Sequence, residues 1–304
     1  MTVVVPATAA NLGPGFDSLG LALGLYDEVT VRLTDAPGLS VEMTGEGADL
    51  LPRDGSHLVA RTLRDAFQRF GAGPAGMSVR CTNHIPQGRG LGSSAAAIVA
   101  GVLAAAALTA DGRTDRAERA GRADIAEVLA VAGEIEGHPD NVAACLLGGF
   151  TIAWTEGGRA HAVRLDPVPT IEALVFVPPS GLSTETARGL LPAAVPHRDA
   201  VHAASRAALA VAAITRRPDL LLAATEDRLH QPYRAPAMAA TAALMERLRE
   251  GGVAAFVSGA GPSVLALLPD ERPDLAALAE PGWSVIRLPL DLQGARLVEP
   301  VEEK

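Results

Sequence analysis

The segment that most constrains this chain is a glycine- and serine-rich run over residues 86–96, which reads PQGRGLGSSAA. It follows an alternating pattern over residues 77–81, typical of a strand, and leads into an alanine-rich apolar run over residues 95–110, typical of a buried helix. The alternating glycines allow positive φ angles and a close approach of the backbone to a ligand. The paired serines begin the helix, where free N–H groups and the helix dipole favour an anion. The pattern predicts a strand–loop–helix unit that binds a polyphosphate. A plain turn with Ser93 as the helix cap is the alternative interpretation, and it would explain part of the same pattern.

The single lysine of the chain, Lys304, excludes several ways of handling phosphate. A Walker A lysine, a protein-kinase strand lysine and a Schiff-base lysine are all missing. A dinucleotide-binding oxidoreductase is disfavoured because Ser93 occupies the third glycine position of that fingerprint. Phosphate chemistry must therefore use backbone N–H groups, arginine and a metal ion. Arg89, inside the loop, is expected either to approach a phosphate or to be merely solvated.

Composition limits the class of protein. A chain of 304 residues can hold two packed domains, and its 48% hydrophobic and 20% charged residues are ordinary for a globular protein. The net charge of −9 does not favour binding to the nucleic-acid backbone. The densest basic group comprises Arg116, Arg119 and Arg122, and it alternates with acidic residues, which is typical of a solvated helix face. The apolar run is too short for a membrane span, no signal peptide is evident, and Cys81 and Cys145 make no zinc site. We expect a cytoplasmic protein without nucleic-acid or membrane partners.

Periodicity along the chain predicts a mixed α+β protein of two domains. The expected strands cover residues 3–5, 26–33, 39–43, 77–81, 150–154, 173–177, 254–257, 264–268 and 285–290. The expected helices cover residues 57–70, 95–110, 123–136, 140–147, 183–191, 197–213, 238–250 and 273–278. The residue pattern changes over residues 155–166, so a domain boundary is expected there, with the domains at 1–158 and 159–304.

Three segments carry a resemblance to a known family. The pattern P-x-x-x-G-L-G-S-S-A resembles the phosphate loop of the GHMP kinases, residues 3–20 (VVVPATAANLGPGFDSLG) resemble their N-terminal motif, and residues 257–268 (VSGAGPSVLALL) resemble their C-terminal glycine motif. The resemblance implies an N-terminal ATP-binding domain like ribosomal protein S5 domain 2, followed by a ferredoxin-like domain. It also implies nucleotide contacts by Pro86, Gln87, Gly88, Arg89, Gly90, Leu91, Gly92, Ser93, Ser94, Ala95 and Ala96. His57 stands where many members have an asparagine, and is expected to replace it as a donor to the nucleotide.

Four further segments are similar to the homoserine kinases within that family. They read PATAANLGPGFDSLG near the N-terminus, EGHPDN at 136–141, STETAR at 183–188 and HQPYR at 230–234. The resemblance implies that ATP, with Mg²⁺, phosphorylates L-homoserine to O-phospho-L-homoserine, a precursor of threonine. Another kinase of the family, acting on mevalonate, shikimate or a sugar, and a non-catalytic nucleotide-binding regulator remain as alternatives. A homodimer is a further expectation from the family.

The chemistry of homoserine suggests roles for these residues. Its carboxylate calls for an arginine fork, for which Arg188 and Arg234 are candidates, and its ammonium calls for the oxygens of Asn11 or Asp17. Each residue also has a plainer interpretation as a helix cap, a turn residue or a solvated arginine. The family implies substrate contacts by Asn11, Asp17, His138, Asn141, Thr184, Arg188, Arg234 and Gly261. Of these, Asn141, His138 and Arg188 are the expected catalytic group.

The metal ligands are expected to be one loop serine and one helix glutamate. Ser94 is assigned ahead of Ser93, and Glu134 ahead of Glu136. The two glutamates face different sides of a helix, so only one of them can point at the loop.

The mechanism is predicted from an amide. Related kinases have an aspartate where this sequence has Asn141, and an amide cannot accept a proton as a base. We therefore expect direct attack of the substrate hydroxyl on the γ-phosphate, with catalysis by positioning and charge stabilisation.

Overall fold

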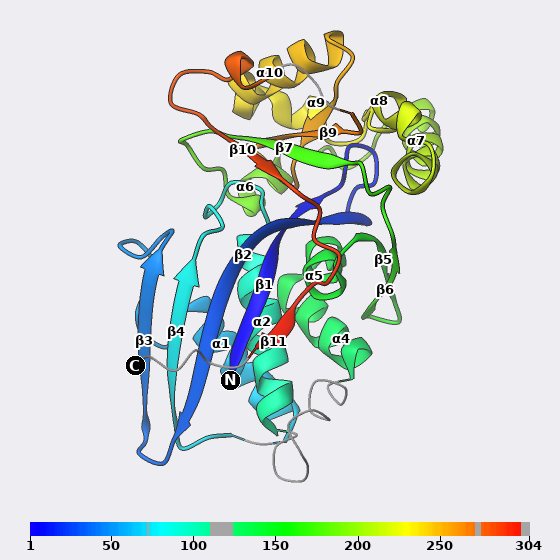
Figure 1. Cartoon of the computed structure of the whole chain (residues 1–304). Coiled ribbons are helices and arrows are strands. Elements are labelled where there is room, and N and C mark those ends of the chain that lie inside the picture. The colour runs from blue at the N-terminus through cyan, green and yellow to red at the C-terminus, as the bar shows by residue number, and fades with distance from the viewer. Residues whose placement is uncertain (72, 110–123, 271–274, 299–304) are drawn as a thin grey trace.

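The protein consists of two sheets, each with its own helices, that meet at the glycine-rich loops (Figure 1). A computed structural model describes residues 1–71, 73–109, 124–270 and 275–298. This arrangement of helices and sheets confirms the expected α+β class. The arginines at 116, 119 and 122 lie outside the described residues.

Within the described residues the first sheet has seven strands, and β2 is its central strand, paired with β1, β4 and β5. The strand order is β11-β1-β2-β4-β3, with β5 pairing β2 and β6. The strands are β1 (Thr2–Ala10), β2 (Leu19–Thr34), β3 (Gly38–Gly45), β4 (Gly76–Asn83), β5 (Phe150–Glu156), β6 (Arg159–Leu165) and β11 (Arg296–Val298). Every residue of β1 is buried, which explains its almost continuous run of small and β-branched side chains. β3 and β4 run parallel, whereas the other pairs are antiparallel.

In the part of the chain that the structure describes, four helices cover one face of this sheet: α1 (Leu58–Arg69), α2 (Ser93–Thr109), α4 (Ile125–Glu136) and α5 (Pro139–Leu147) (Figure 1). α2 contacts β1 and all three other helices, and its alanines keep these contacts close. A side chain at Gly101 of α2 would collide with Thr62 of α1, so the two helices can approach only with glycine there. Among the described residues, no helix has the length and apolarity that a membrane crossing requires.

The second sheet is antiparallel, with the order β10-β7-β9-β8. Its strands are β7 (Glu172–Val177), β8 (Ala254–Val257), β9 (Val264–Leu268) and β10 (Ser284–Leu288). The helices of this part are α6 (Thr184–Gly189), α7 (His197–Thr215), α8 (Leu221–Ala224), α9 (Gln231–Arg234) and α10 (Ala239–Glu250), with 3₁₀ turns η2 (Pro218–Leu220), η3 (Ala235–Met238) and η4 (Ala276–Leu278). Phe176, Leu244 and Leu248 lie in a separate apolar cluster between this sheet and α10.

The expected division at 158/159 falls in the tight turn between β5 and β6. The strand β6, within the segment expected to join the domains, pairs with β5 in the first sheet. After the second sheet the chain returns to the first, where β11 pairs with β1. By strand pairing, the first part therefore comprises residues up to Leu165 together with β11. Of the helix expected at 273–278, residues 276–278 form the turn η4, and residues 273–274 lie outside the described residues.

Candidate active site

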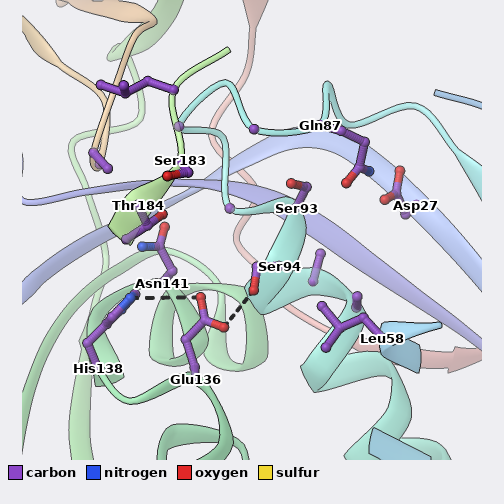
Figure 2. Close-up of a pocket in the computed structure, with 18 of the residues that line it drawn as sticks. Asp27, Leu58, Gln87, Ser93, Ser94, Glu136, His138, Asn141, Ser183 and Thr184 are labelled. Atoms are coloured by element: carbon purple, nitrogen blue, oxygen red, sulfur yellow. Dashed lines mark hydrogen bonds and ion pairs between the residues drawn. The ribbon is translucent and has the colours of Figure 1, made fainter. Parts of the chain in front are cut away.

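Hydrogen bonds to backbone oxygens bring the three glycine-containing motifs together, although they are far apart in the sequence. The N–H of Thr8 in β1 donates to Leu91 O at 3.0 Å, and the Gly259 N–H donates to Ala10 O at 3.1 Å. The Ser258 hydroxyl donates to Gly90 O at 2.7 Å. Beside this junction lies a cavity of about 390 Å³, lined by residues of the first sheet and by loops and short helices that accompany the second sheet (Figure 2).

The glycine loop forms one wall of the cavity, and its geometry explains its composition. Gly88, Gly90 and Gly92 all have positive φ, at 64°, 75° and 71°. A Cβ at Gly92 would collide with the Thr8 side chain, and one at Gly90 with the carbonyl oxygen of Ser258. Ser93 begins α2, and Ser93 and Ser94 both line the cavity. The loop thus presents the free N–H groups of a helix start to the cavity.

Not every residue of the expected nucleotide segment faces the cavity. Gln87, Gly88, Gly90, Gly92, Ser93, Ser94 and Ala96 line it, and Pro86, Arg89, Leu91 and Ala95 do not. The guanidinium of Arg89 donates to the carbonyl oxygens of Pro178 at 3.0 Å, Gln87 at 3.0 Å and Pro179 at 2.5 Å. Arg89 therefore fixes the loop to the segment after β7. This structural role differs from both of the roles expected from the sequence.

The two candidate metal glutamates have opposite surroundings. Glu136, the last residue of α4, accepts a hydrogen bond from the Ser94 hydroxyl at 2.7 Å, and its side chain is 10% exposed (Figure 2). Glu134 lies outside the cavity and pairs with Arg69 through two bonds of 2.7 and 2.6 Å. Two residues on a helix differ by about 200° in direction, so only one of these side chains reaches Ser94. The structure gives this place to Glu136 instead of the expected Glu134.

Ser94 and Glu136 fit a magnesium ion in the kind of atom they offer. A hydroxyl and a carboxylate are hard oxygen donors, and Mg²⁺ takes few ligands from the protein. Burial raises the pKa of Glu136, against the opposing effects of the Ser94 hydrogen bond and of His138, whose Nε2 lies 4.0 Å from Glu136 Oε1. Among the described residues, no cluster of three or more His, Cys, Asp or Glu side chains forms a denser metal site.

The segment after α4 adds three polar side chains to the cavity. His138 Nδ1 lies 3.0 Å from Asp140 Oδ1, and Asn141 Oδ1 accepts a hydrogen bond from the Thr8 hydroxyl at 2.8 Å. Burial lowers the pKa of His138, but the hydrogen bond and charge of Asp140 outweigh this effect and leave the pKa raised. Asp140 itself is buried and lines the cavity.

Asp17 and Arg188 lie together on the side of the second sheet. The Arg188 guanidinium donates to both Asp17 oxygens, at 3.0 and 2.5 Å. Asp17 and Asn11 have positive φ, at 56° and 68°, and Asn11 holds the loop by accepting from the Asp17 N–H and donating to Gly259 O. The neighbouring Thr184 also lines the cavity (Figure 2).

Arg234 is a nearly fully buried cation, with 1% of its surface exposed. Its guanidinium donates to Ala187 O at 3.2 Å and to Gly259 O at 3.2 Å, and lies 3.1 Å from His230 Nδ1. Burial lowers the pKa of Arg234, and the nearby positive charge of Arg188 acts in the same direction. Arg234 and Gly261 both line the cavity, so the structure brings all eight expected substrate residues to it.

His57 lies at the other end of the cavity, directly before α1. It is 4% exposed, and within the described part of the chain its Nδ1 has no hydrogen-bond partner. Burial lowers the pKa of His57, so the ring is neutral around pH 7. A buried nitrogen without a partner at a cavity wall is available to a ligand.

Sequence reasoning missed Asp27 and Phe16, which line the same cavity. Asp27 is buried and accepts the backbone N–H groups of His84 at 2.6 Å and Ile85 at 2.9 Å, which fixes the chain just before the loop. Its position beside Gln87 is visible in Figure 2. An acid inside a strand gives no signal of this contact in the sequence, because the contact depends on the pairing of β2 with β4.

Comparison with known proteins agrees with this arrangement. The sequence matches the description "GHMP kinases N terminal domain" over residues 57–149 and "GHMP kinases C terminal" over residues 208–280. A homoserine kinase of Streptomyces avermitilis is 58% identical over 297 residues, covering 97% of this chain and 95% of the relative. A homoserine kinase of Mycobacterium tuberculosis is 50% identical over 275 residues, covering 89% and 85%.

Solved structures show the same similarity. The crystal structure of a homoserine kinase from Cytophaga hutchinsonii has a TM-score of 0.80 and 26% identity, covering 98% of this chain and 97% of that one. A mevalonate kinase of L. major crystallised with R-mevalonate has a TM-score of 0.66 at 15% identity, covering 96% of each chain, which shows the shared fold alone. From these matches and the three joined motifs, the chain belongs to the GHMP kinase family.

Proposed function

We propose that this chain transfers the γ-phosphoryl group of ATP to the side-chain hydroxyl of L-homoserine. The observation that carries the proposal is the cavity itself, because it has an anion-binding loop on one wall and paired charges of opposite sign on another. This combination suits a triphosphate and a zwitterion held side by side. The whole-length similarity to homoserine kinases supports the same substrate.

The triphosphate is assigned to the loop from Gly88 to Ser94. Backbone N–H groups at the start of α2 offer hydrogen bonds and the positive end of the helix dipole, which compensates for the missing lysine. The base is assigned to the end of the cavity beside Leu58, where the free Nδ1 of His57 can bond a nucleobase nitrogen or amine. His57 would then replace the amide expected from the family.

We assign Mg²⁺ to Ser94 and Glu136 on the basis of their contact and burial. When bound there, the ion would neutralise charge on the β- and γ-phosphate oxygens. Glu134 has no such role in this proposal, because its carboxylate is held outside the cavity by Arg69.

The substrate zwitterion is assigned to the Asp17–Arg188 pair. These two side chains neutralise each other in the structure. A ligand with one ammonium and one carboxylate can separate them, because its ammonium can pair with Asp17 and its carboxylate with Arg188. Arg234 supplies a second guanidinium for the carboxylate. A substrate with a carboxylate but no ammonium, such as mevalonate, would take Arg188 and leave Asp17 without a partner, which favours homoserine.

The transfer step needs orientation of the hydroxyl more than proton removal. His138, Asp140 and Asn141 line the same cavity as the substrate charges and the loop, and the Asn141 oxygen already accepts a hydrogen bond from Thr8. The hydroxyl oxygen forms the new bond to the γ-phosphorus, the bond to the bridging oxygen breaks, ADP leaves, and the hydroxyl proton is released to solvent. We assign no general base among these three residues, and attribute the rate to positioning and charge stabilisation.

The proposal is tested by measuring ADP release with L-homoserine, mevalonate, shikimate and galactose as separate acceptors. We expect turnover with L-homoserine and none above background with the other three. Turnover of another acceptor without turnover of L-homoserine would replace the substrate. Nucleotide binding without any turnover would instead identify a regulator.

A further inference from the structure

One aromatic ring contacts both of the arginines assigned to the substrate carboxylate. The guanidinium carbons of Arg188 and Arg234 each lie 5.4 Å from the centre of the Phe16 ring. The His230 ring packs against the same ring, with centroids 5.3 Å apart and planes inclined at 35°. Phe16 lines the cavity from the loop between β1 and β2.

The two arginines lie on different short helices, which the hydrogen bond from Arg234 to Ala187 O joins directly. Arg188 lies on α6 and bonds Asp17, whereas Arg234 lies on α9 and bonds main-chain oxygens. His230 extends the second group, because its Nε2 lies 2.7 Å from Gly13 O and its Nδ1 accepts from Arg234. Phe16 is therefore the side chain that touches both guanidinium groups and also belongs to the loop carrying Asp17.

The contact with Phe16 offsets electrostatic repulsion between the two arginines. Two guanidinium groups that converge on one small site repel each other, and burial weakens the screening by water. The negative face of an aromatic ring attracts a cation within about 6 Å of its centre, and more strongly where water is excluded. An aliphatic side chain of similar size would fill the space without this attraction.

We infer that Phe16 is a positioning and specificity residue, which holds Arg188 and Arg234 at the spacing that selects the carboxylate of an amino-acid substrate. The inference rests on the proposed function, because it concerns the homoserine end of the same cavity. Phe16 does not take part in the transfer step and lies in a different segment from the residues assigned to the nucleotide.

The test compares Phe16→Leu with Phe16→Tyr, which keeps the ring. Loss of two cation–π contacts should raise the KM for L-homoserine about 5- to 30-fold in the leucine variant. We expect kcat and the KM for ATP to change less than about 3-fold, and the tyrosine variant to stay within about 3-fold of wild type throughout. The inhibition constant of 3-aminopropan-1-ol, which is homoserine without its carboxylate, should be the same in all three proteins.

Several outcomes would overturn the inference. An unchanged KM for L-homoserine in the leucine variant refutes it, as does an equal rise in the KM for ATP or an equal loss in the tyrosine variant. Melting temperatures identify a folding defect, in which case Phe16→Met is measured in its place. Failure of the proposed function gives a different result, because the wild-type protein would then not turn over L-homoserine at all.

Discussion

Exchanging Glu136 for glutamine should abolish most turnover without weakening the fold, whereas the same exchange at Glu134 should leave turnover unchanged. The two residues lie two positions apart on α4, carry the same charge, and differ in what they face. Glu134→Gln is thus a matched control that separates loss of charge on this helix from loss of charge at the cavity.

The expected size follows from the position of the Glu136 carboxylate. At an effective dielectric of about 20, one unit charge acts on another about 4 Å away with about 4 kcal/mol, which corresponds to about 1,000-fold in rate. Water in the open cavity screens part of this interaction, so we expect a fall in kcat of about 100- to 1,000-fold. Glutamine keeps the size of the side chain and an oxygen for the Ser94 hydroxyl, so the local geometry is retained.

The stability of the Glu136→Gln variant should be equal to or higher than that of the wild type, although its turnover falls. Burial raises the pKa of Glu136 in the folded protein above its ordinary value of 4.5, so the folded state holds its proton more tightly than the unfolded state does. The contribution of this group to the free energy of unfolding therefore decreases as pH rises through that window, and at pH 7 the ionised carboxylate is a cost. A neutral glutamine removes this cost, and Glu136→Gln should unfold at the same or a higher urea concentration.

The assay is ADP release at saturating L-homoserine and Mg²⁺-ATP, combined with urea unfolding at pH 7. Retention of more than about a tenth of the wild-type kcat in Glu136→Gln would refute the assignment. An equal loss of kcat in Glu134→Gln would refute it independently.

Three further predictions concern the other walls of the cavity. Gly92→Ala should lose more stability and more turnover than Gly88→Ala, measured by urea unfolding and ADP release, because both have positive φ but only the Gly92 Cβ would collide with Thr8; equal effects would contradict this reasoning. Burial lowers the pKa of His57 below 6.5, so the unfolded state binds more protons below that pH, and unfolding midpoints at pH 5.5 and 7.5 should differ more in wild type than in His57→Asn. An identical pH difference in the two proteins would show that His57 does not titrate as described. Arg234→Leu should raise the KM for L-homoserine by about 10- to 100-fold with a smaller change in kcat, since one charge-assisted contact to the carboxylate is lost; an unchanged KM would remove Arg234 from the substrate site.

Sequence alone predicted the elements with strong periodicity and the loops with several glycines. The strands β8 and β9 have the predicted bounds, and α2 begins within two residues of its predicted start. The eight substrate residues could be named because each lies in a motif with its own spacing, so their convergence did not have to be derived from packing. Their meeting in one cavity is a result of the structure.

What could not be predicted depends on contacts between distant segments. The helical pattern of α4 allowed either Glu134 or Glu136 to face Ser94, and the choice is set by how α4 packs against α2. β6 carries polar and charged residues on both faces, so its pattern gave no strand signal, and only its pairing with β5 defines it. In the sequence, Phe16 is an ordinary aromatic residue of a loop. Its contacts with two cations arise only in the fold, where α6 and α9 place Arg188 and Arg234 beside it.

The return of the C-terminal segment to pair with β1 makes the second sheet an insertion within the first. Two covalent crossings, one after β6 and one before β11, join the two parts. A fragment ending at residue 158 would lack the neighbours of β5 and β1 on one side, leaving rows of unsatisfied backbone donors and acceptors at two sheet edges. Such edges invite association with other chains, so the N-terminal part depends on the last strand for its solubility as well as for its shape.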